Sequence, residues 1–536
     1  MNLPFVLDIG IGLFSIYLTL SLLASEFQEL LTTLLQWRAQ HLKQSIETLL
    51  AGSSKPELGE PSRDVLVIQD RLDRSKALAN RLYDHPLIRS LDHESKGLLG
   101  SVTERISQWT GASKTFAGRA SGPSYLPSET FAATLLEVLK IEALMQTLSK
   151  EKLTQAVDER LIKSVLELTT DLNHNESQEL FLKSELQKFQ TEIDGILQSF
   201  ASQQTIPATI SKEIADSTKR FFTAIEVLLP QDESIRQRFI TDLGAIEQQI
   251  PSLCEGSKTT IVEVIAELNN MARVAQLIQK TAGDFQAVVS QLPDLEQQQR
   301  SKTAYDLLQQ MVKNSTQKED GFRVTLTLLS PNLCDSLALL SKQAQAKLNT
   351  PETTTPEQAI NQLGQEVALW FDRSMDRSAG VYKRNAKGVA ILIGLVIAVT
   401  TNTDTLHIIN RLAQDSALRT AYSQAASNFV SANPNAIACL QTQTDPTAQV
   451  NCLSSGATSL RVAIDRTTAL PIGWNGLNWR EQWQVQWPNP LLGGLKILSG
   501  WLVSALALSM GAPFWFNLLN KVVNVRNSGK PPASTS

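Results

Sequence analysis

The sequence predicts an all-α fold, with three transmembrane helices and a large helical-bundle cytoplasmic domain between the first and second of them. Long apolar runs lie near the N-terminus and in the C-terminal part of the chain. The region between them is polar and rich in Gln, Glu, Ser, Thr and Leu, a composition that favours helix. The chain has 536 residues, enough for several domains, and its net charge of -4 gives no reason to expect nucleic acid as a partner.

The first predicted span occupies residues 1–25. Its apolar stretch from Leu3 to Ala24 contains one charged residue, Asp8. About 22 helical residues at ~1.5 Å each give roughly 33 Å, which is enough to cross a bilayer. A secretory signal peptide is the alternative, but the stretch has neither a basic n-region nor a small-residue cleavage pattern. The helix is expected to continue into a membrane-proximal helical region, residues 26–145.

Two further spans are predicted, at residues 386–409 and 491–512. The segment between them, residues 410–490, is then an outer loop domain, periplasmic or lumenal. Residues 513–536 are expected to form a cytoplasmic interfacial helix, "FWFNLLNKVVNVR", and a disordered tail. Basic residues set this orientation, because cytoplasmic flanks carry an excess of Lys and Arg. They are Arg373, Arg377, Lys383, Arg384 and Lys387 before the second span, and Lys521, Arg526 and Lys530 after the third.

The predicted outer loop contains two cysteines and a group of tryptophans. An oxidising compartment would permit a disulfide between Cys439 and Cys452; the alternative is that all four cysteines of the chain are unpaired. Four tryptophans precede the third span and are interpreted as interface anchors, with carbohydrate or partner binding as the second interpretation. They are Trp474, Trp479, Trp483 and Trp487.

Residues 146–385 are predicted to be a helical bundle or a coiled-coil-like cytoplasmic region. Prolines divide the region into helix-sized pieces, and apolar residues recur at spacings of three and four. In "TTPEQAI", Thr355 can cap a helix, Pro356 suits its first position and Gln358 completes a capping box. Three apolar stripes are expected to face a core: Leu135, Val138, Ile141, Met145 and Leu148; Phe189, Ile193, Ile196 and Phe200; and Ile261, Ile265, Leu268 and Met271.

Motifs that would identify an enzyme are missing from the sequence. It contains no HExxH, GxSxG or CxxC, and "GSKTT" and "GASKT" lack the earlier glycine of a phosphate-binding loop. His85 and His93 stand eight residues apart, each beside an aspartate, but a surface or capping role is favoured over zinc. We therefore expect no metal, no cofactor and no enzymatic activity.

One polar cluster is predicted inside the membrane. Asp8 and Lys496 both lie about five residues inside the outer ends of their spans, roughly 7 to 8 Å deep, where they could meet. The second span loses its apolar character at "TTNTDT". In one hypothesis Asn402 and Asp404 turn inward and join Asp8 and Lys496, either as structural contacts or as an ion path. In the slightly favoured alternative, Asp404 caps a separate interfacial helix, "TLHIINRL".

Several segments together resemble a family of uncharacterised bacterial integral membrane proteins. They are "LDIGIGLFSIYLTLSLLASEFQELL", "LYDHPLIRSL", "PSYLPSETFAATLLEVL", "WFDRSMDRSAGVYKR", "NTDTL" and "GAPFWFNLLNKVVNVR". The resemblance covers both ends well and residues 146–355 poorly. It implies three spans, a helical cytoplasmic region and a bacterial cytoplasmic membrane, with a thylakoid membrane as the alternative, and it supplies no activity.

Two functions are weighed on these observations. The first is a non-enzymatic membrane scaffold or tether, which contacts membrane lipids and binds protein partners or itself through the helical cytoplasmic region. The second is an oligomeric ion or proton transport or sensing protein that uses the intramembrane polar cluster. An exposed apolar surface or an oligomeric interface would favour the first.

Overall fold

The computed structural model shows that the chain folds into α-helices. Within its described residues there is no β-strand, as the sequence predicts. The structure describes residues 3–34, 37–52, 62–91, 122–170, 176–202, 207–229, 233–256, 258–280, 289, 295–313, 320–348, 355–432, 472–474, 476–484 and 490–528.

The chain forms two compact units. The terminal unit comprises residues 1–38, 98–111 and 376–536, so it joins the two ends of the chain. The central unit comprises residues 39–97 and 112–375. One long helix, α17 (Pro356–Thr400), contributes residues to both units.

The body of the central unit is a cluster of helices around one apolar core. Its largest buried side chains include Phe131 and Phe371, whose rings stack with centroids 4.3 Å apart. The predicted boundary at residue 145 falls within α7, and helices from both sides of it share this core. The helices are α2 (Trp37–Ala51), α3 (Ser62–Asp84), α4 (Pro86–Arg89), α6 (Ser128–Val138), α7 (Ile141–Ala156), α12 (Ile261–Lys280), α14 (Leu295–Lys313), α15 (Asp320–Thr327), α16 (Pro331–Lys347) and the first part of α17.

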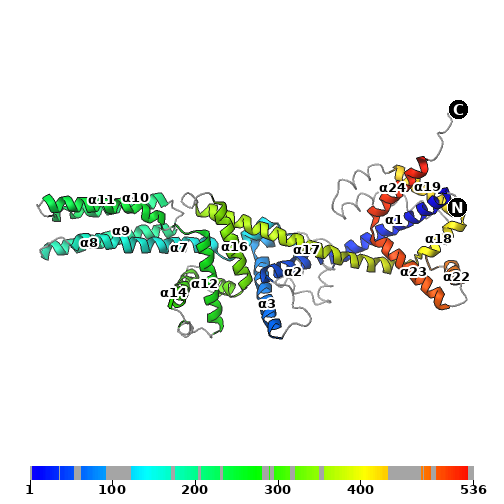
Figure 1. The fold of residues 1–536 in the computed structure, drawn as a ribbon, viewed down its shortest axis with the longest axis horizontal. Helices are drawn as coiled ribbons and strands as arrows, with labels where there is room; N and C mark the ends of the chain where they lie inside the picture. The colour runs from blue at the N-terminus through cyan, green and yellow to red at the C-terminus, as the bar shows by residue number, and fades with distance from the viewer. Residues whose placement is uncertain are drawn as a thin grey trace, which may run out of the picture. The chain divides into compact units, whose positions relative to one another are not determined.

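A second core in the central unit belongs to an arm of antiparallel helices, which lie side by side in Figure 1. A row of aromatic rings holds the arm together: Phe189 stacks on Phe221, and Phe222 meets Phe239 edge-on at 5.9 Å. The arm consists of the end of α7, the π-helix η3 (Val157–Ile162), α8 (Lys163–Thr170), α9 (Glu176–Ser202), α10 (Pro207–Ile225), the 3-10 turn η4 (Glu226–Leu228) and α11 (Glu233–Gly256).

Two predicted caps are confirmed in the central unit. Thr355 N–H donates to Gln358 Oε1 at 3.0 Å and Gln358 N–H donates to Thr355 Oγ1 at 3.2 Å, which is the reciprocal capping box at the start of α17. His85 caps α4, where its Nδ1 accepts from Leu87 N–H. His93 lies outside the described residues.

The described side chains of the apolar stripes face the cores, with one difference from the prediction; the Phe200 side chain lies outside the described part of the chain. Ile261, Ile265, Leu268 and Met271 are completely buried in α12. The stripe from Leu135 to Leu148 is divided between α6 and α7, because Lys140 has a left-handed backbone with φ 52°. Apolar spacing continues across this break because both helices pack on the same core.

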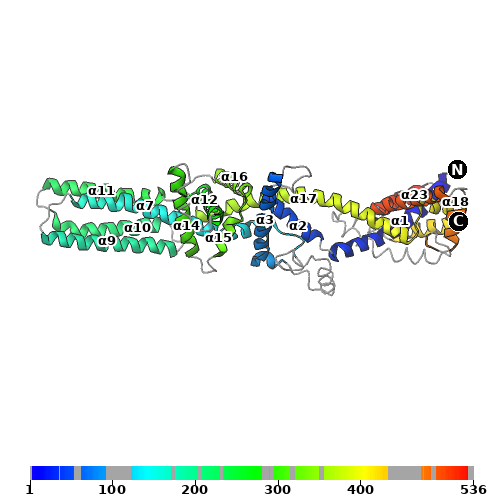
Figure 2. The same cartoon turned by 90° about the horizontal axis from the view of Figure 1, so that it is seen from below.

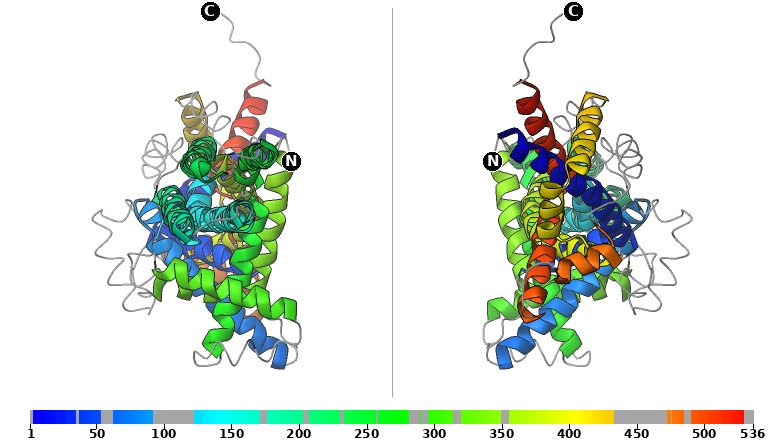
Figure 3. Two further views of the ribbon diagram at one scale, coloured as in Figure 1. Left: turned by 90° about the vertical axis from the view of Figure 1, so that its left-hand side faces the viewer. Right: turned by 90° about the vertical axis from the view of Figure 1, so that its right-hand side faces the viewer.

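Among the described residues, the terminal unit packs five further helices with α1 (Leu3–Leu34) and the last turns of α17. They are α18 (Thr405–Gln414), α19 (Ser416–Ala432), α22 (Gly476–Gln484), α23 (Pro490–Ser509) and α24 (Ala512–Ser528). In Figures 1 and 3, α1 in blue runs beside α24 in red and α19 in yellow. Their shared core includes Ile11, Leu18, Tyr422 and Phe516, all nearly inaccessible to solvent.

One helix is long and apolar enough to cross a membrane alone: α1, over Phe5–Gln28. The other two predicted spans are each part of a bent pair. Ala386–Thr400 and Thr405–Gln414 meet at 52°, and Gly493–Ser509 and Ala512–Arg526 meet at 94°. A further bent pair, Gly321–Thr327 with Pro331–Lys347, lies in the central unit, so the described residues contain up to four candidate spans.

The helix predicted to lie on the membrane surface, α24, packs along the N-terminal half of α1. The Trp515 ring lies 4.7 Å from that of Tyr17, and Arg526 pairs with Asp8 about two and a half turns further along α1. The two helices run antiparallel, and the apolar face of α24 is buried against α1. Residues 529–536, the predicted tail, lie outside the described residues.

Candidate polar site at a broken helix

The end of α17 is a Schellman turn followed at once by a new helix. Thr403 N–H donates to Ala398 O at 2.8 Å and Asn402 N–H donates to Val399 O at 3.1 Å, the two bonds that define this motif. Asn402 has a left-handed backbone, with φ 45°, which asparagine tolerates better than most residues. The polar cluster "TTNTDT" therefore ends one helix and starts the next.

The segment Gly473–Trp474 closes the end of α17. Gly473 N–H donates to Thr401 O at 2.7 Å, and the Trp474 indole N–H lies 3.0 Å from both Val399 O and Thr400 O. These contacts satisfy carbonyls that the helix end leaves without an intrahelical donor. Trp474 was expected as an interface anchor, with carbohydrate or partner binding as the second interpretation. Half of the residue is exposed, and its indole nitrogen serves as the cap.

The Asn402 side chain is fully buried and shared among three partners. Its amide nitrogen donates to Gly473 O and to Gln482 Oε1 at 3.0 Å. Its oxygen accepts from the indole of Trp501 on α23 at 3.2 Å. Asn402 therefore links the end of α17 to α22 and α23, and every described contact of its side chain is a structural one.

Asp404 is the N-cap of α18, as the favoured interpretation of the sequence predicts. Its carboxylate accepts from Leu406 N–H at 2.9 Å and from His407 N–H at 3.4 Å. The side chain is 3 % exposed, and it lies directly against Gly500 of α23, where a β-carbon would overlap its Oδ1. Lys496, one turn earlier on α23, is exposed and close enough to attract the carboxylate.

A chain of buried hydroxyls continues from this cap to α1 and α23. Tyr17 Oη lies 2.6 Å from Thr405 Oγ1, which lies 2.7 Å from Ser504 Oγ. Three helices thus cross at a polar junction, with each hydroxyl partnered by another. A small residue also lets α17 approach α23 closely: a β-carbon at Gly394 of α17 would clash with Ala505 O of α23.

His407 and Arg411 lie one turn apart on α18 and face α22. Arg411 Nη1 donates to Glu481 Oε1 at 3.2 Å. His407 is 8 % exposed, and Asn478 and Glu481 are close enough to interact with its ring. Nevertheless, His407 Nε2 has no hydrogen-bond partner within the described part of the chain. In the sequence His407 closely follows the polar cluster, but no motif assigned it a role.

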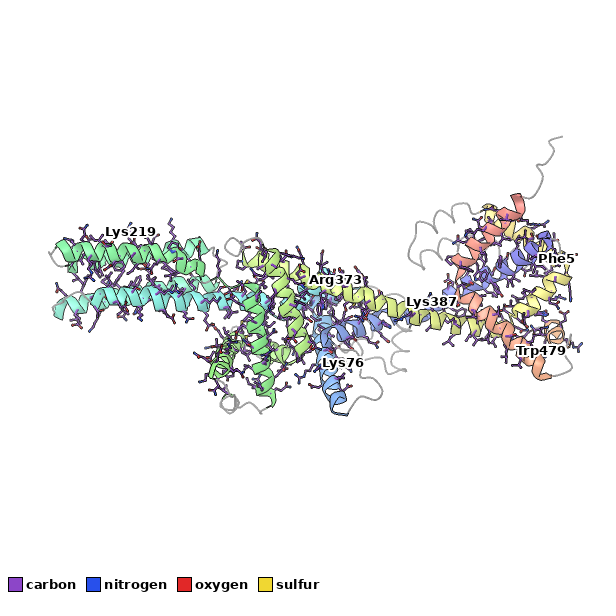
Figure 4. All side chains as sticks on the ribbon, viewed as in Figure 1. Phe5, Lys76, Lys219, Arg373, Lys387 and Trp479 are labelled. Atoms are coloured by element: carbon purple, nitrogen blue, oxygen red, sulfur yellow. The ribbon has the colours of Figure 1, made fainter. Side chains whose placement is uncertain are left out.

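Asp8 belongs to a different group of side chains. Its Oδ1 accepts from Arg526 Nε at 3.0 Å and from Ser423 Oγ at 3.4 Å. Nearby, the Arg419 guanidinium lies over the Phe5 ring, which Figure 4 labels near the start of α1. The hypothesis of a single cluster placed Asp8 beside Lys496; in the structure α19 and α24 cover this end of α1 and supply its partners.

The predicted disulfide cannot be placed in this arrangement. Cys439 and Cys452 both lie outside the described residues, so their pairing stays a prediction. Of the predicted site residues, the structure brings together Asn402, Asp404 and Lys496 around α23, and it pairs Asp8 elsewhere.

Fold and junction together define an all-α protein with at least one helix able to cross a membrane and a polar junction of structural caps. Comparison of the chain with protein-family models, with curated proteins and with solved structures finds no match. The resemblance to bacterial integral membrane proteins therefore stays a prediction.

Proposed function

We propose that the protein is a non-enzymatic membrane scaffold or tether, whose central unit binds protein partners or a second copy of the chain. The observation that carries this proposal is an apolar surface at the outer end of the arm. There α8 ends, α9 begins, α10 passes into η4 and α11 begins (Figure 2). The exposed side chains, called the tip surface below, are Leu166, Leu180, Phe181, Val227 and Ile240.

Burying side chains of this size is worth roughly 1.5–3 kcal/mol each, so leaving several of them exposed at one end of a domain is typical of a docking surface. Val227 is 85 % exposed and Leu180 is 69 % exposed, whereas their chain neighbours Leu228 and Leu182 pack in or against the core of the arm. The arm therefore carries exposed apolar side chains that are not part of its own core and are available to a partner.

The described thiols do not favour a nucleophilic role. Burial raises the pKa of Cys334 to about 11 and raises the pKa of Cys254, whereas a reactive cysteine needs a lowered thiol pKa. Within the described residues, no group of His, Cys, Asp and Glu side chains has the arrangement of a metal site.

Membrane lipids are the second class of partner in this proposal. The span in α1 anchors the terminal unit, and the bacterial cytoplasmic membrane, or alternatively a thylakoid membrane, is the proposed location. With the basic residues before residue 388 on the cytoplasmic side, the central unit is cytoplasmic.

A second function is favoured by one observation, the buried junction at α18. An ion or proton path would use the Tyr17–Thr405–Ser504 hydroxyl chain and the Nε2 of His407, which has no hydrogen-bond partner among the described residues. In this alternative, several copies of the chain assemble and the junction conducts or senses protons.

Crosslinking with mass spectrometry on the native, detergent-extracted protein separates the two functions. Wild type is compared with a tip variant, Leu180→Ser with Val227→Ser, and with Lys219→Ser, an exposed polar position on the same arm. The scaffold predicts discrete crosslinks to a partner or second copy that disappear only in the tip variant. Unchanged crosslinks in the tip variant would contradict it.

The same preparations test the alternative in sealed vesicles. His407→Gln and Asp8→Asn with Lys496→Met are compared with wild type for proton and ion flux. Flux that His407→Gln abolishes, in protein that keeps its helical content, would favour transport. Equal flux in wild type, in all variants and in protein-free vesicles would contradict the transport function.

A further inference from the structure

The terminal unit has two outward surfaces of opposite character. One is formed by α17 and α23 and is apolar; the other is formed by α19 and α24 and is mainly polar. We propose that the α17–α23 surface is where the hydrocarbon of a bilayer contacts the protein, and that the α19–α24 surface is not lipid-covered. Lipid contact at this surface rests on the membrane location proposed above and is independent of docking at the arm.

Large exposed apolar side chains recur along both helices of the α17–α23 surface. On α17 an adjacent pair is followed four residues later by a third side chain, and on α23 the exposed side chains recur every three or four residues with one adjacent pair, so each set lies on one face of its helix. The exposed side chains are Ile391, Leu392 and Val396 of α17, and Leu495, Leu498, Leu502, Val503, Leu506 and Met510 of α23. The two helices hold this surface together by the close contact of Gly394 with the backbone of Ala505.

Charged and aromatic residues mark the two edges of this surface. Arg384 and Lys387 are exposed immediately before it begins on α17, and Figure 4 labels Lys387 on this helix. At the other end, Trp474 and Trp479 are partly exposed beside the end of α17, and Lys496 is exposed on α23. Cationic residues at headgroup phosphates and tryptophans at the interface are the usual boundaries of a bilayer-facing surface.

The helix that is long and apolar enough to cross a membrane by itself among the described residues, α1, exposes few large apolar side chains. Of its described large apolar side chains, Val6, Leu23 and Phe27 are exposed, while α18, α19, α23 and α24 pack on the rest. Half of its span is buried within the unit. Together, α17 and α23 therefore expose more large apolar side chains than α1 does.

The α19–α24 surface has the composition of one that meets water or another polar surface. Its exposed residues are Thr420, Gln424 and Asn428 on α19, and Asn517, Lys521 and Asn524 on α24. Two large apolar side chains stand among them, Phe514 and Val525. Placing these amides and the Lys521 ammonium group in hydrocarbon would cost several kcal/mol. On the α17–α23 surface the exposed Lys496 lies near the start of α23, at the edge of the surface.

Two valines provide a matched comparison. Val396 on α17 is 61 % exposed and Val525 on α24 is 59 % exposed, so they differ in surroundings and not in chemistry or access. The wild-type protein is reconstituted in phosphatidylcholine vesicles with a lipid that carries a diazirine in its acyl chain, irradiated and mapped by mass spectrometry. We expect adducts at Val396 and its neighbours on α17 and α23, at least five-fold more than at Val525.

A second measurement uses water-soluble access. Val396→Cys and Val525→Cys are treated with a charged maleimide in vesicles permeabilised to it, and again in denaturant to give the full extent of labelling. Val525→Cys should react and Val396→Cys should be protected. Equal lipid adducts at the two valines, or faster maleimide reaction at Val396→Cys, would overturn the proposal. The proposal would also be overturned if both cysteine variants were protected from maleimide and both valines carried lipid adducts.

Discussion

Asp8, near the start of α1, and Arg526, near the end of α24, form an ion pair with 3.0 Å between Oδ1 and Nε, and both side chains are about four-fifths buried. The pair fixes the register in which the two antiparallel helices pack. It also accounts for the one acidic residue in the apolar stretch of α1.

Loss of this pair should destabilise the terminal unit in a way that depends on both partners. Asp8→Asn and Arg526→Gln are each expected to lower stability, and the double variant should lose less than the sum, with a coupling of about 1–3 kcal/mol. Thermal unfolding in detergent measures this cycle. Lys521→Gln, exposed on the same helix, should change little, and a coupling near zero would mean that the pair does not hold the register.

Gly500 is expected to resist substitution because Asp404 occupies the space beside it. A β-carbon there would overlap the Asp404 carboxylate, so Gly500→Ala must displace the cap of α18 or separate α23 from it. We expect a loss of about 1–3 kcal/mol. Gly494→Ala, on the same helix with open space around it, serves as the control. Equal stability of the two variants would show that α23 does not pack on Asp404.

Asn402 contributes through its backbone and its side chain, and two substitutions separate these contributions. Asn402→Gly keeps the left-handed backbone and removes the hydrogen bonds that the side-chain amide makes with Gln482 and Trp501. Asn402→Ala removes the bonds and also disfavours the backbone, so it should be the less stable variant by roughly 1 kcal/mol. Unfolding curves compare them. If the alanine variant equals or exceeds the glycine variant, the positive φ is not required.

Glu267, in the body of the central unit, should make stability depend on pH. Burial raises its pKa, the Glu151 carboxylate raises it further, and a hydrogen bond from Asn270 opposes both. Because the folded state then holds the proton more tightly than the unfolded state, stability rises as the pH falls from neutral through the raised folded pKa. Glu267→Gln should therefore raise the melting temperature at neutral pH and flatten this pH dependence.

Glu263, on the same helix, provides a control of opposite sign. Burial acts to raise its pKa, but hydrogen bonds from Lys152 and Thr260 lower it overall. Its stabilising contribution is present above the ordinary carboxyl pKa and is lost as the pH falls through the lowered one. Glu263→Gln should therefore reduce the melting temperature at neutral pH. The same direction of change for both glutamine variants would contradict this assignment.

Features that depend on neighbouring residues were predictable from the sequence. The helical class follows from local composition and apolar spacing. In the capping box at Thr355 and the caps at His85 and Asp404, each side chain binds a backbone group within three residues of itself. The apolar stripes likewise gave the buried faces, since periodicity reports which side of a helix is covered.

Features that depend on which helices meet were not predictable. Periodicity does not identify the neighbour on the buried face, so the sequence could not show that α24 lies along α1 or that Asp8 pairs with Arg526. The division of the stripe at Lys140 was missed because lysine is not a usual left-handed residue. Trp474 was missed as a cap because an indole donor far along the chain has no local signature.

The packing of α24 along α1 also orders the events of biosynthesis. Residues up to Leu34 leave the ribosome first, and α24 begins at Ala512; at ~5–20 residues per second the interval is roughly 25–100 s. During that time the face of α1 that α24 will cover has no permanent neighbour. Lipid, the translocation machinery or a chaperone must shield it until the other end of the chain arrives, so the terminal unit is completed only after the central unit has been synthesised.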